Sequence, residues 1–271
     1  MSAIGELQNV SPSEAFDNVA EIFDETFENE ITGRLREKIY HVIESFAAPG
    51  SSLLDMSCGT GIDGLTLARR GYNVVGLDIA PKMIEIAKAK AIRERLSTAR
   101  FQLGSFEHLT DTTTGSFDIV LSNFGGLNCV RRLEATARQV ASVLKPVGCF
   151  VGTVMPPVCF WEIVAGFSRL NTRAAFRRLS KNIQATGFRG KTFTVYYHPL
   201  RRLLSEFSRW FRPVKIVGLS IFSPPPHAMT FLNNNAKLSR LLEQCDEALG
   251  WLPVLRAIGD HYMVVLRKDS N

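Results

Sequence analysis

The sequence predicts an α/β fold in which a mostly parallel β-sheet is covered by helices on both faces. Between residues 51 and 154, short apolar runs alternate with amphipathic segments through short connections, which is the pattern of successive βαβ units. A tight glycine loop, Cys58-Gly59-Thr60-Gly61, directly follows the first apolar run, as where a buried parallel strand meets a helix beside a ligand. With 271 residues, 45% of them hydrophobic, the chain can bury a sizeable core.

The elements of this central region follow from periodicity and from helix-ending residues. Gly71 stands just past a predicted helix, where a left-handed C-cap is favoured, and Pro81 stands in a first helical turn. Apolar runs predict strands at 51–56, 73–78, 99–103, 117–122 and 148–154, and amphipathic spacing predicts helices at 62–70, 81–96 and 130–144.

The flanking regions follow a different pattern. Residues 13–46 keep apolar positions three to four apart, which predicts helix, with a break at Gly33. Pro156-Pro157 interrupts the alternation, and a stiff connector is expected at Pro224-Pro225-Pro226. The patterns beyond residue 155 predict a basic amphipathic helix at 159–182, strands at 191–197, 214–222 and 261–267, and helices at 200–210 and 236–249.

Charge is distributed unevenly within the net total of +6. Residues 1–50 contain ten acids and three bases, whereas residues 169–215 contain twelve bases and one acid. Such asymmetry either marks an anionic partner or reflects solvated helix faces, some of them paired with the acidic N-terminus. The sequence leaves both explanations open.

Composition excludes several classes of protein. The five cysteines are widely spread and form no CxxC, so neither a disulfide framework nor a metal site is implied. No apolar run is long enough to predict a membrane span, and the N-terminus lacks the basic and apolar parts of a secretion signal. We therefore expect a cytoplasmic protein; its oligomeric state stays open.

Two acids frame the glycine loop and indicate the ligand. Gly59, Gly61 and Gly64 satisfy GxGxxG, which dinucleotide-dependent dehydrogenases share. Asp55 precedes the loop, where its carboxylate suits an ammonium group or a bound water and would repel a pyrophosphate. Asp78 ends the next strand, where a carboxylate can accept two hydrogen bonds from a ribose diol. A nucleoside cofactor is predicted, with an NAD-dependent oxidoreductase as one alternative.

Four segments together resemble class I S-adenosylmethionine-dependent methyltransferases of the small-molecule, natural-product type. Asp55-Met56-Ser57-Cys58-Gly59-Thr60-Gly61 resembles the family's first motif, and Asp78 its acid on the ribose hydroxyls. Residues 116–124 look like its fourth strand and residues 145–150 like its turn into the fifth. The resemblance implies a Rossmann-like seven-stranded sheet whose last, antiparallel strand lies between the fifth and sixth. It also implies S-adenosylmethionine as methyl donor and S-adenosylhomocysteine as product.

The resemblance also implies a cofactor site and a domain plan. Ser105 stands where family members often carry an acid, which leaves the adenine contact open among the Ser105 hydroxyl, the Phe106 N–H and Glu107. Arg36 is either a contact of the cofactor carboxylate or a surface ion pair. The implied cofactor contacts are Asp55, Ser57, Cys58, Gly59, Thr60, Gly61, Asp78, Ile79, Met83, Ser105, Phe106, Glu107, Asn123 and Phe124, with Phe16 and Phe23 as lid residues.

The chain is expected to divide into four parts of a single structural domain. Residues 1–50 are predicted to form a helical lid and residues 51–155 the cofactor-binding core. Residues 156–212 are predicted to form an inserted cap that recognises the acceptor, and residues 213–271 the strands that complete the sheet.

Catalysis is the least determined feature. Methyl transfer from a sulfonium is an in-line displacement, so positioning and desolvation carry most of it, and a general base is needed only for a protonated acceptor. His198, Tyr196 and Tyr197 of the inserted region are the candidate catalytic residues, and Asn128 and His261 are further candidates. For His261, at the start of the last strand, a structural role is the favoured expectation. Asn123-Phe124-Gly125-Gly126 in place of Asn-Pro-Pro-Tyr argues against DNA amino-methylation.

The sequence leaves the acceptor open. A small or medium-sized acceptor, anionic or linked to a peptide or lipid, as in bacterial secondary metabolism, is the leading expectation. RNA is the alternative, because bases and aromatic residues interleave in the inserted region. A non-enzymatic scaffold that docks on acidic lipid or a protein is a further alternative.

Overall fold

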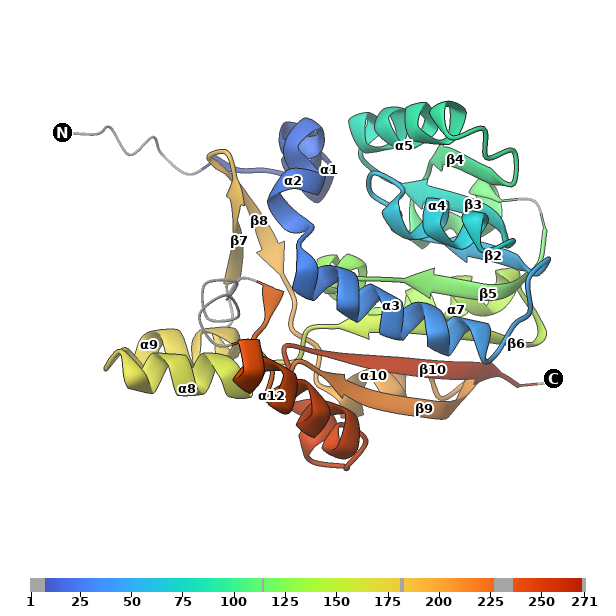
Figure 1. Ribbon diagram of the computed structural model, residues 1–271. Helices are drawn as coiled ribbons and strands as arrows, with labels where there is room; N and C mark the ends of the chain where they lie inside the picture. Colours follow the sequence, from blue (N-terminus) through green and yellow to red (C-terminus); the bar gives the residue numbers. More distant parts are fainter. Residues whose placement is uncertain (1–7, 114, 181–182, 227–235, 270–271) are drawn as a thin grey trace.

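A seven-stranded sheet forms the centre of the computed structural model, which describes residues 8–113, 115–180, 183–226 and 236–269 (Figure 1). The strands lie in the order β4-β3-β2-β5-β6-β10-β9. Neighbours from β4 to β6 are parallel, and β10 is antiparallel to both β6 and β9. The predicted sheet, with its antiparallel strand between the fifth and sixth, is confirmed. Its strands are β2 (Ser52–Asp55), β3 (Asn73–Asp78), β4 (Ala99–Leu103), β5 (Phe117–Ser122), β6 (Leu144–Val154), β9 (Phe211–Leu219) and β10 (His261–Lys268).

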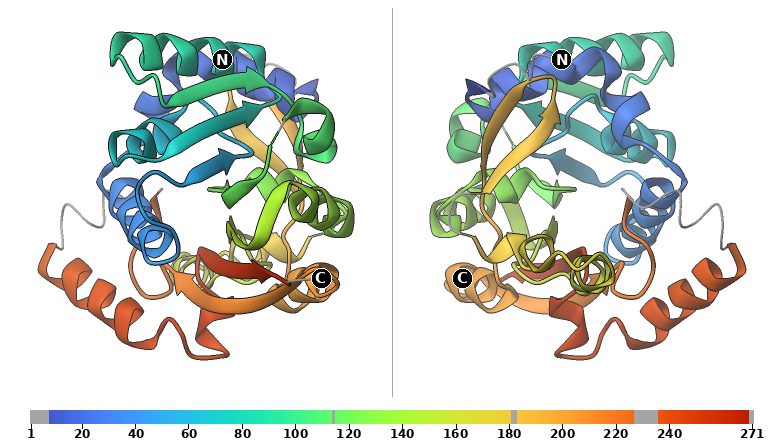
Figure 2. Two further views of the ribbon diagram at one scale, coloured as in Figure 1. Left: turned by 90° about the vertical axis from the view of Figure 1, so that its right-hand side faces the viewer. Right: turned by 90° about the vertical axis from the view of Figure 1, so that its left-hand side faces the viewer.

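Alternation along the strands divides the apolar core into two layers. Leu53 contributes to one hydrophobic cluster and Leu54 to the other, because successive side chains of a strand point to opposite faces. One face is covered by α3 (Glu30–Glu44), α4 (Ile62–Arg69) and α5 (Pro81–Arg93); α6 (Leu109–Thr112), α7 (Leu133–Val143) and α10 (Leu200–Phe207) cover the other (Figure 2). Helices on both faces are thereby confirmed.

The break in the N-terminal helix lies earlier than predicted. The segment folds as α1 (Pro12–Val19), η1 (Ala20–Ile22) and α2 (Phe23–Phe27) before α3 begins. The Asn29 side chain accepts hydrogen bonds from the Ile31 and Thr32 N–H groups at 3.0 and 3.1 Å and thereby caps α3. Gly33 lies inside α3, so the predicted break there was wrong: a cap at Asn29 begins the helix.

Helix α3 belongs to the core, although residues 1–50 were all predicted to form the lid. Ile31, Leu35 and Ile39 are buried in the first hydrophobic cluster, against the sheet. Residues of α1 and α2 line the cavity described below, and so do Thr32 and Arg36 of α3. Residues 1–7 of the predicted lid lie outside the described residues.

The inserted segment contains a helical pair and an additional hairpin. The predicted helix 159–182 was wrong, since the chain forms α8 (Phe160–Ser168), α9 (Thr172–Ala175) and η4 (Arg177–Leu179); residues 181–182 lie outside the described ones. A Cβ atom on Gly166 would lie 2.6 Å from the Cβ of Ala175, so this glycine lets α9 fold back closely on α8.

A second, three-stranded sheet contains strands from both the N-terminal segment and the inserted segment. β7 (Ile183–Phe188), which was not predicted, pairs antiparallel with β8 (Lys191–Val195). β1 (Gln8–Asn9) pairs parallel with β8. The N-terminal lid and the inserted cap, predicted as separate parts, therefore share one sheet.

Helix α12 (Ala236–Leu249) lies beside α3. Arg34 and Lys38 of α3 form ion pairs with Glu243 and Glu247 at 2.8 and 3.1 Å. Of the helices in the described part of the chain, none combines the length and apolar character required to cross a bilayer.

Phe101 fixes the glycine loop to the sheet. A Cβ atom on Gly61 would lie 3.0 Å from this ring, and one on Gly64 3.1 Å from it. On Gly76 the distance would be 2.4 Å, well inside van der Waals contact. The aromatic ring thus occupies the space that these glycines leave free.

We predict that Gly76→Ala lowers the free energy of unfolding by about 1–3 kcal/mol, because it overpacks the space beside Phe101. Adding Phe101→Leu should recover part of the loss. Gly33→Ala is the matched control: a Cβ there meets nothing within 4 Å, so a gain of about 0.5–1 kcal/mol is expected in the helix. Urea unfolding measures all three; equal losses for both alanine variants would contradict this packing.

Candidate active site

A cavity of about 380 Å³ lies at the carboxyl ends of β2, β3 and β5. The strand order reverses between β2 and β5, and ligands of open α/β sheets bind at such a point. The core lines it with Met56, Ser57, Cys58, Gly59, Thr60, Ile62, Asp63, Asp78, Ile79, Met83, Phe106, Asn123, Phe124, Met155 and His261, among others. The lid and cap contribute Pro12, Phe16, Phe23, Phe27, Ala185, Phe188, Phe193 and Val195.

Asp55 is buried beneath the glycine loop with one carboxylate oxygen unpartnered. Its Oδ1 accepts a hydrogen bond from the Ser57 N–H at 3.4 Å, whereas Oδ2 is buried without a partner. Burial, together with the nearby charge of Asp63, raises the pKa of the Asp55 carboxyl well above its usual range. A positively charged ligand group would relieve this electrostatic cost.

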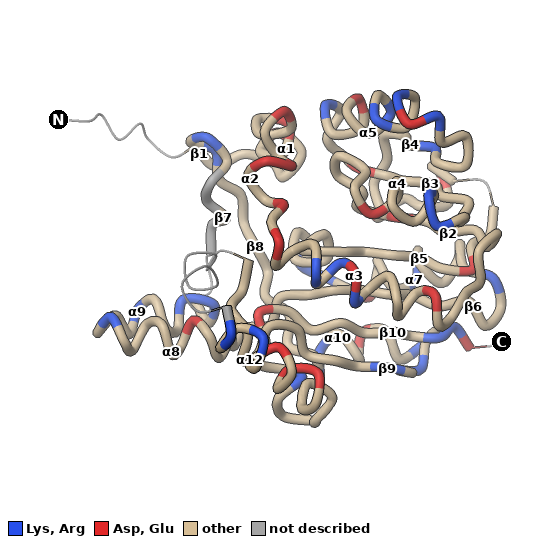
Figure 3. Tube along the Cα trace, in the orientation of Figure 1, with Lys and Arg blue, Asp and Glu red and all other residues tan. Residues whose placement is uncertain are grey.

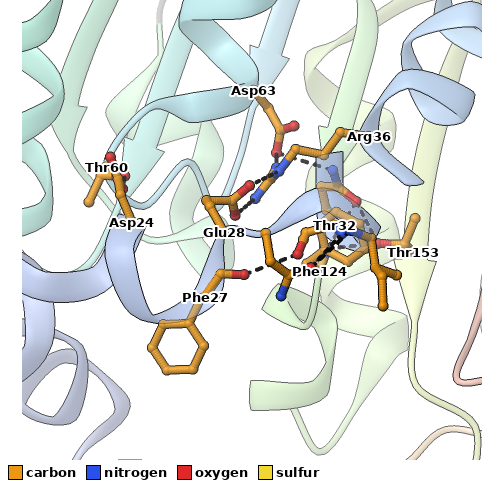
Figure 4. Close-up of polar contacts among 12 residues, drawn as sticks. Asp24, Phe27, Glu28, Thr32, Arg36, Thr60, Asp63, Phe124 and Thr153 are labelled. Atoms are coloured by element: carbon orange, nitrogen blue, oxygen red, sulfur yellow. Dashed lines mark hydrogen bonds and ion pairs between the residues drawn. The ribbon is translucent and has the colours of Figure 1, made fainter. Parts of the chain in front are cut away.

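Asp63 is held by three polar side chains at the start of α4, and Figure 4 shows one of them, Arg36, between Asp63 and Glu28. The Tyr40 hydroxyl donates to Asp63 at 2.6 Å, the Asn123 amide donates at 3.1 Å, and Arg36 forms an ion pair with it. Arg36 also contacts Glu28 through two hydrogen bonds of 3.0 and 2.6 Å. The Arg36 guanidinium is therefore the centre of a buried ion-pair cluster, not a partner in a surface ion pair.

Asp78 receives two backbone hydrogen bonds and keeps further acceptor capacity. The Gly59 N–H donates to its Oδ2 at 2.9 Å, and the Ala80 N–H donates to its Oδ1 at 2.9 Å. Burial raises the pKa of the Asp78 carboxyl, although these N–H groups oppose the rise. Because each carboxylate oxygen can accept more than one bond, both stay able to receive ligand hydroxyls.

The turn after β5 directs an aromatic ring into the cavity. Phe124 has a left-handed φ of 41°, which costs energy for a residue with a side chain. Its N–H donates to the Thr153 hydroxyl at 2.7 Å, and that hydroxyl donates to Asn123 at 2.8 Å. The Arg36 guanidinium lies 4.9 Å from the centre of the Phe124 ring. These contacts fix the strained turn.

The lid is attached to the glycine loop by polar contacts. Thr60 donates a hydrogen bond to Asp24 of α2 at 2.5 Å, and Lys90 of α5 forms an ion pair with the same carboxylate. Ser13 of α1 donates to the Ile79 carbonyl at 2.8 Å. The lid is thus closed over the loop that follows β3.

Aromatic side chains from the lid and the cap form the outer wall. Phe16 lies 5.1 Å from Phe188 and 5.4 Å from Phe193, measured between ring centres. Phe27 lies 6.0 Å from Phe188. This side of the cavity is apolar, whereas the glycine-loop side carries carboxylates, so the two ends suit different ligand groups.

Most of the predicted cofactor contacts line this one cavity. They are Ser57, Cys58, Gly59, Thr60, Asp78, Ile79, Met83, Phe106, Asn123 and Phe124, with the lid residues Phe16 and Phe23. Asp55 and Gly61 lie beneath the surface of the cavity. Ser105 and Glu107 are not among the lining residues: the Ser105 hydroxyl accepts from the Glu107 N–H at 3.1 Å and caps η2 (Phe106–His108), which leaves Phe106 as the turn's contribution.

The structure argues against His198 as a base. It is fully buried, and its Nε2 lies 2.8 Å from the Val130 carbonyl and 3.2 Å from that of Leu127. Burial lowers the pKa of this imidazole. A buried ring whose Nε2 donates to backbone carbonyls has the contacts of a structural group, and His198 does not line the cavity, so the structure favours this role over the predicted catalytic one.

The other inserted candidates also lie away from the cavity lining. The Tyr197 ring lies 5.1 Å from the Arg178 guanidinium, and burial raises the pKa of its hydroxyl. The Tyr196 backbone holds Asn128: its N–H donates to the Asn128 carbonyl at 2.8 Å, and its own carbonyl accepts from the Asn128 amide at 2.7 Å. Tyr196 and Tyr197 therefore support the cap. Asn128 lines the cavity and also joins the cap to Met155, the residue that follows β6.

The sequence offered His261 as a catalytic candidate but favoured a structural role for it; the structure brings this residue to the cavity. Its Nδ1 lies 3.0 Å from the Asp260 carboxylate, and its ring lies 5.5 Å from that of Phe124. The adjacent Asp-His pair at the start of the last strand was the available signal. Phe188 and Phe193 were also not predicted as cavity residues, since their position depends on the β7–β8 hairpin.

The two thiols of the cavity are unsuited to nucleophilic chemistry. Burial raises the pKa of Cys58 well above its usual range and that of Cys129 to about 12. Because the thiolate is the reactive form, neither side chain is prepared for attack. Cys159, Glu162 and Asp260 also cluster, but Arg178 already supplies a cation to both carboxylates.

The sheet order, the loop cradled by Asp78 and the unpartnered Asp55 define a Rossmann-like α/β protein with a nucleoside-cofactor site. The residues fit S-adenosylmethionine, because the buried, unpartnered Oδ2 of Asp55 suits its ammonium group and Asp78 suits its ribose. Residues 53–148 match the family model of a methyltransferase domain. Over these residues the chain carries a methyltransferase domain.

Named relatives share this domain. The chain is 31% identical over 137 residues to the ubiquinone biosynthesis O-methyltransferase of Xanthomonas campestris pv. campestris (strain B100), covering 48% of this chain and 54% of that protein. It is 34% identical over 140 residues to the demethylmenaquinone methyltransferase of Tropheryma whipplei (strain Twist), covering 50% and 54%. The matches thus span about half the length of these curated relatives.

A solved structure extends the likeness to the whole fold. The CcbJ methyltransferase from Streptomyces caelestis superposes with a TM-score of 0.63 at 17% identity, covering 96% of this chain and 100% of that one. At this identity the likeness shows the fold alone.

We predict that Asp55→Asn stabilises the ligand-free protein at neutral pH and weakens cofactor binding. The folded pKa of Asp55 exceeds its unfolded value, so the stability it contributes is present at low pH and is lost as pH rises through the folded pKa. The variant's advantage should be about 1 kcal/mol or more at pH 7 and should shrink on acidification. Thermal unfolding across pH, with and without cofactor, measures both effects; an advantage that grows on acidification would contradict the assignment.

Proposed function

We propose that this protein transfers the methyl group of S-adenosylmethionine to a small, largely apolar acceptor that carries an ionisable hydroxyl. The observation that carries the proposal is the polarity of the cavity. Buried carboxylates lie at the glycine loop and aromatic side chains at the lid and cap. The cofactor supplies an electrophilic methyl group on a sulfonium, and the chain's residues supply binding, orientation and exclusion of water.

The cofactor end is assigned by the chemistry of its side chains. Asp55 is proposed to hold the ammonium group, either directly or through water, and Asp78 the two ribose hydroxyls. Ile79, Met83 and Phe106 are proposed to enclose the adenine. Ile79 is half-buried and Met83 fully buried, and both lie beside Asp78 in the cavity wall. Asn123 and Phe124 then lie at the end where the methyl group would be presented.

The acceptor end favours an aromatic or otherwise apolar compound. Phe27, Phe188 and Phe193 supply its walls, and such surfaces bind apolar ligands with few polar contacts. A cavity of about 380 Å³ is small for a cofactor and a large acceptor together. The quinone-biosynthetic names of the two relatives support an aromatic acceptor of this kind.

His261 is the proposed general base. It lines the cavity beside Phe124, and the Asp260 carboxylate lies 3.0 Å from its Nδ1. Burial opposes ionisation of Asp260, but His261 and Arg178 hold the pKa of its carboxyl well below the usual range. An ionised Asp260 beside Nδ1 would stabilise the imidazolium that forms when Nε2 accepts the acceptor's proton as methyl transfer proceeds.

The cofactor assignment is tested by calorimetric titration with S-adenosylmethionine and S-adenosylhomocysteine. We expect the wild type to bind both and Asp78→Asn to bind at least about tenfold more weakly, because charge-assisted hydrogen bonds to the ribose are lost. Asp111→Asn removes an exposed carboxylate and should bind like the wild type. Failure of the wild type to bind either ligand at millimolar concentration would refute the function.

The base is tested by transfer of radiolabelled methyl groups to fractionated bacterial extract. We expect a labelled apolar compound with the wild type and a loss of at least about a hundredfold with His261→Gln, while calorimetry shows unchanged cofactor binding. His198→Gln, by contrast, should cost stability more than turnover. Full activity of His261→Gln would refute the assignment of His261 as the general base. Label recovered in RNA rather than in an apolar compound would show that the acceptor is RNA.

A further inference from the structure

The pair formed by α8 and α9 presents an apolar surface to solvent. Phe160, Val164 and Phe167 recur along one side of α8 and are 37%, 49% and 52% exposed. Phe176 and Leu179 continue the surface through α9 and η4. A protein surface rarely exposes so many large apolar side chains together unless it binds a partner or a membrane. We call this surface, residues 160–179, the helical prong.

The residue at the outer turn of the prong has an exposure and a backbone conformation that folding alone does not favour. Leu170 joins α8 to α9, is 95% exposed and has a left-handed φ of 53°. Folding alone favours glycine or asparagine at such a helix end. A fully exposed leucine in a strained backbone position therefore indicates that the side chain serves a contact outside the protein.

The prong is rigidly mounted, so its exposure does not result from loose packing. Gly166 lies against Ala175 where the helices meet, and the Asn171 side chain caps α9 by accepting from the Ala174 N–H at 3.0 Å. At its base, buried Arg178 forms ion pairs with Glu162 at 2.8 Å and with Asp260 at 2.5 Å. The prong is fixed to the residue that neighbours His261.

The charges on the prong are almost all positive. Glu162 is the only acid between residues 156 and 180, and it is buried and already paired with Arg177 and Arg178. Arg169 and Arg173 are exposed beside Leu170. Figure 3 shows bases at the outer end of the α8–α9 pair, which projects from the body of the protein.

We propose that the helical prong docks the protein on an anionic phospholipid surface. Leu170, Phe167 and Phe176 would enter the boundary between headgroups and acyl chains, and Arg169 and Arg173 would contact lipid phosphates. A protein partner fits less well, because a stable protein interface uses roughly 20–30 residues on each side, and only some of the residues of the prong are exposed. This proposal does not rest on methyl transfer.

Flotation of the full-length protein with vesicles tests the proposal. We expect binding to mixed phosphatidylcholine–phosphatidylglycerol vesicles and much weaker binding to phosphatidylcholine alone. The double variant Phe167→Ser/Leu170→Ser should lower the affinity by at least about tenfold. Arg169→Gln/Arg173→Gln should weaken binding to the anionic vesicles and reduce its dependence on salt.

The control is Trp251→Ser/Val254→Ser, which removes apolar side chains that are 60% and 73% exposed outside the prong. This variant should bind vesicles like the wild type. No vesicle binding by the wild type, or an equal loss in the control, would overturn the proposal. Self-association in sedimentation that only the prong variants abolish, without vesicle binding, would assign the surface to a second copy instead. Cofactor binding by every variant is measured by calorimetry. It distinguishes failure of the docking proposal from failure of the proposed methyltransferase function.

Discussion

The ion pair between Arg36 and Asp63 is the interaction on which the site depends. Asp55 and Asp63 both lie buried where β2 passes into α4, and Glu28 approaches the same place from the end of the lid. Arg36 is the cation that contacts two of these three carboxylates. A buried carboxylate without its partner is strongly destabilising. The Arg36 guanidinium therefore offsets the cost of burying carboxylates at this edge of the sheet. It also ties the lid to the core.

The two ends of the cavity differ because they derive from different parts of the fold. The carboxylate end is built on the rigid carboxyl ends of parallel strands, and the aromatic end is built from segments that meet only through the β1–β8–β7 sheet. Sheet ends hold polar groups firmly, whereas the lid and cap contribute apolar surface that excludes water. This division lets one cavity receive a polar cofactor and an apolar acceptor.

The uneven charge of the sequence has two causes in the structure. Lys191 pairs with Glu14 of the N-terminal segment, and Arg202 with Glu206, so some bases hold the fold together. Arg177 and Arg178 are engaged with Glu162. Arg169 and Arg173 stay exposed on the helical prong. The basic segment therefore does not form a continuous phosphate-binding surface. Several of its bases form ion pairs within the protein, and Arg169 and Arg173 make the outer end of the prong positively charged.

The sequence by itself determined the seven strands, the glycine loop and the position of Asp78, because apolar periodicity and turn chemistry are local properties. It did not determine the fold of α8 on α9, the β7 strand or the junction of lid and cap, since these depend on contacts such as Gly166 with Ala175 and Gln8 with Lys191. Nor did it distinguish His198 from His261. Both are histidines beside strands, and only tertiary packing buries the first among carbonyls and brings the second to the cavity.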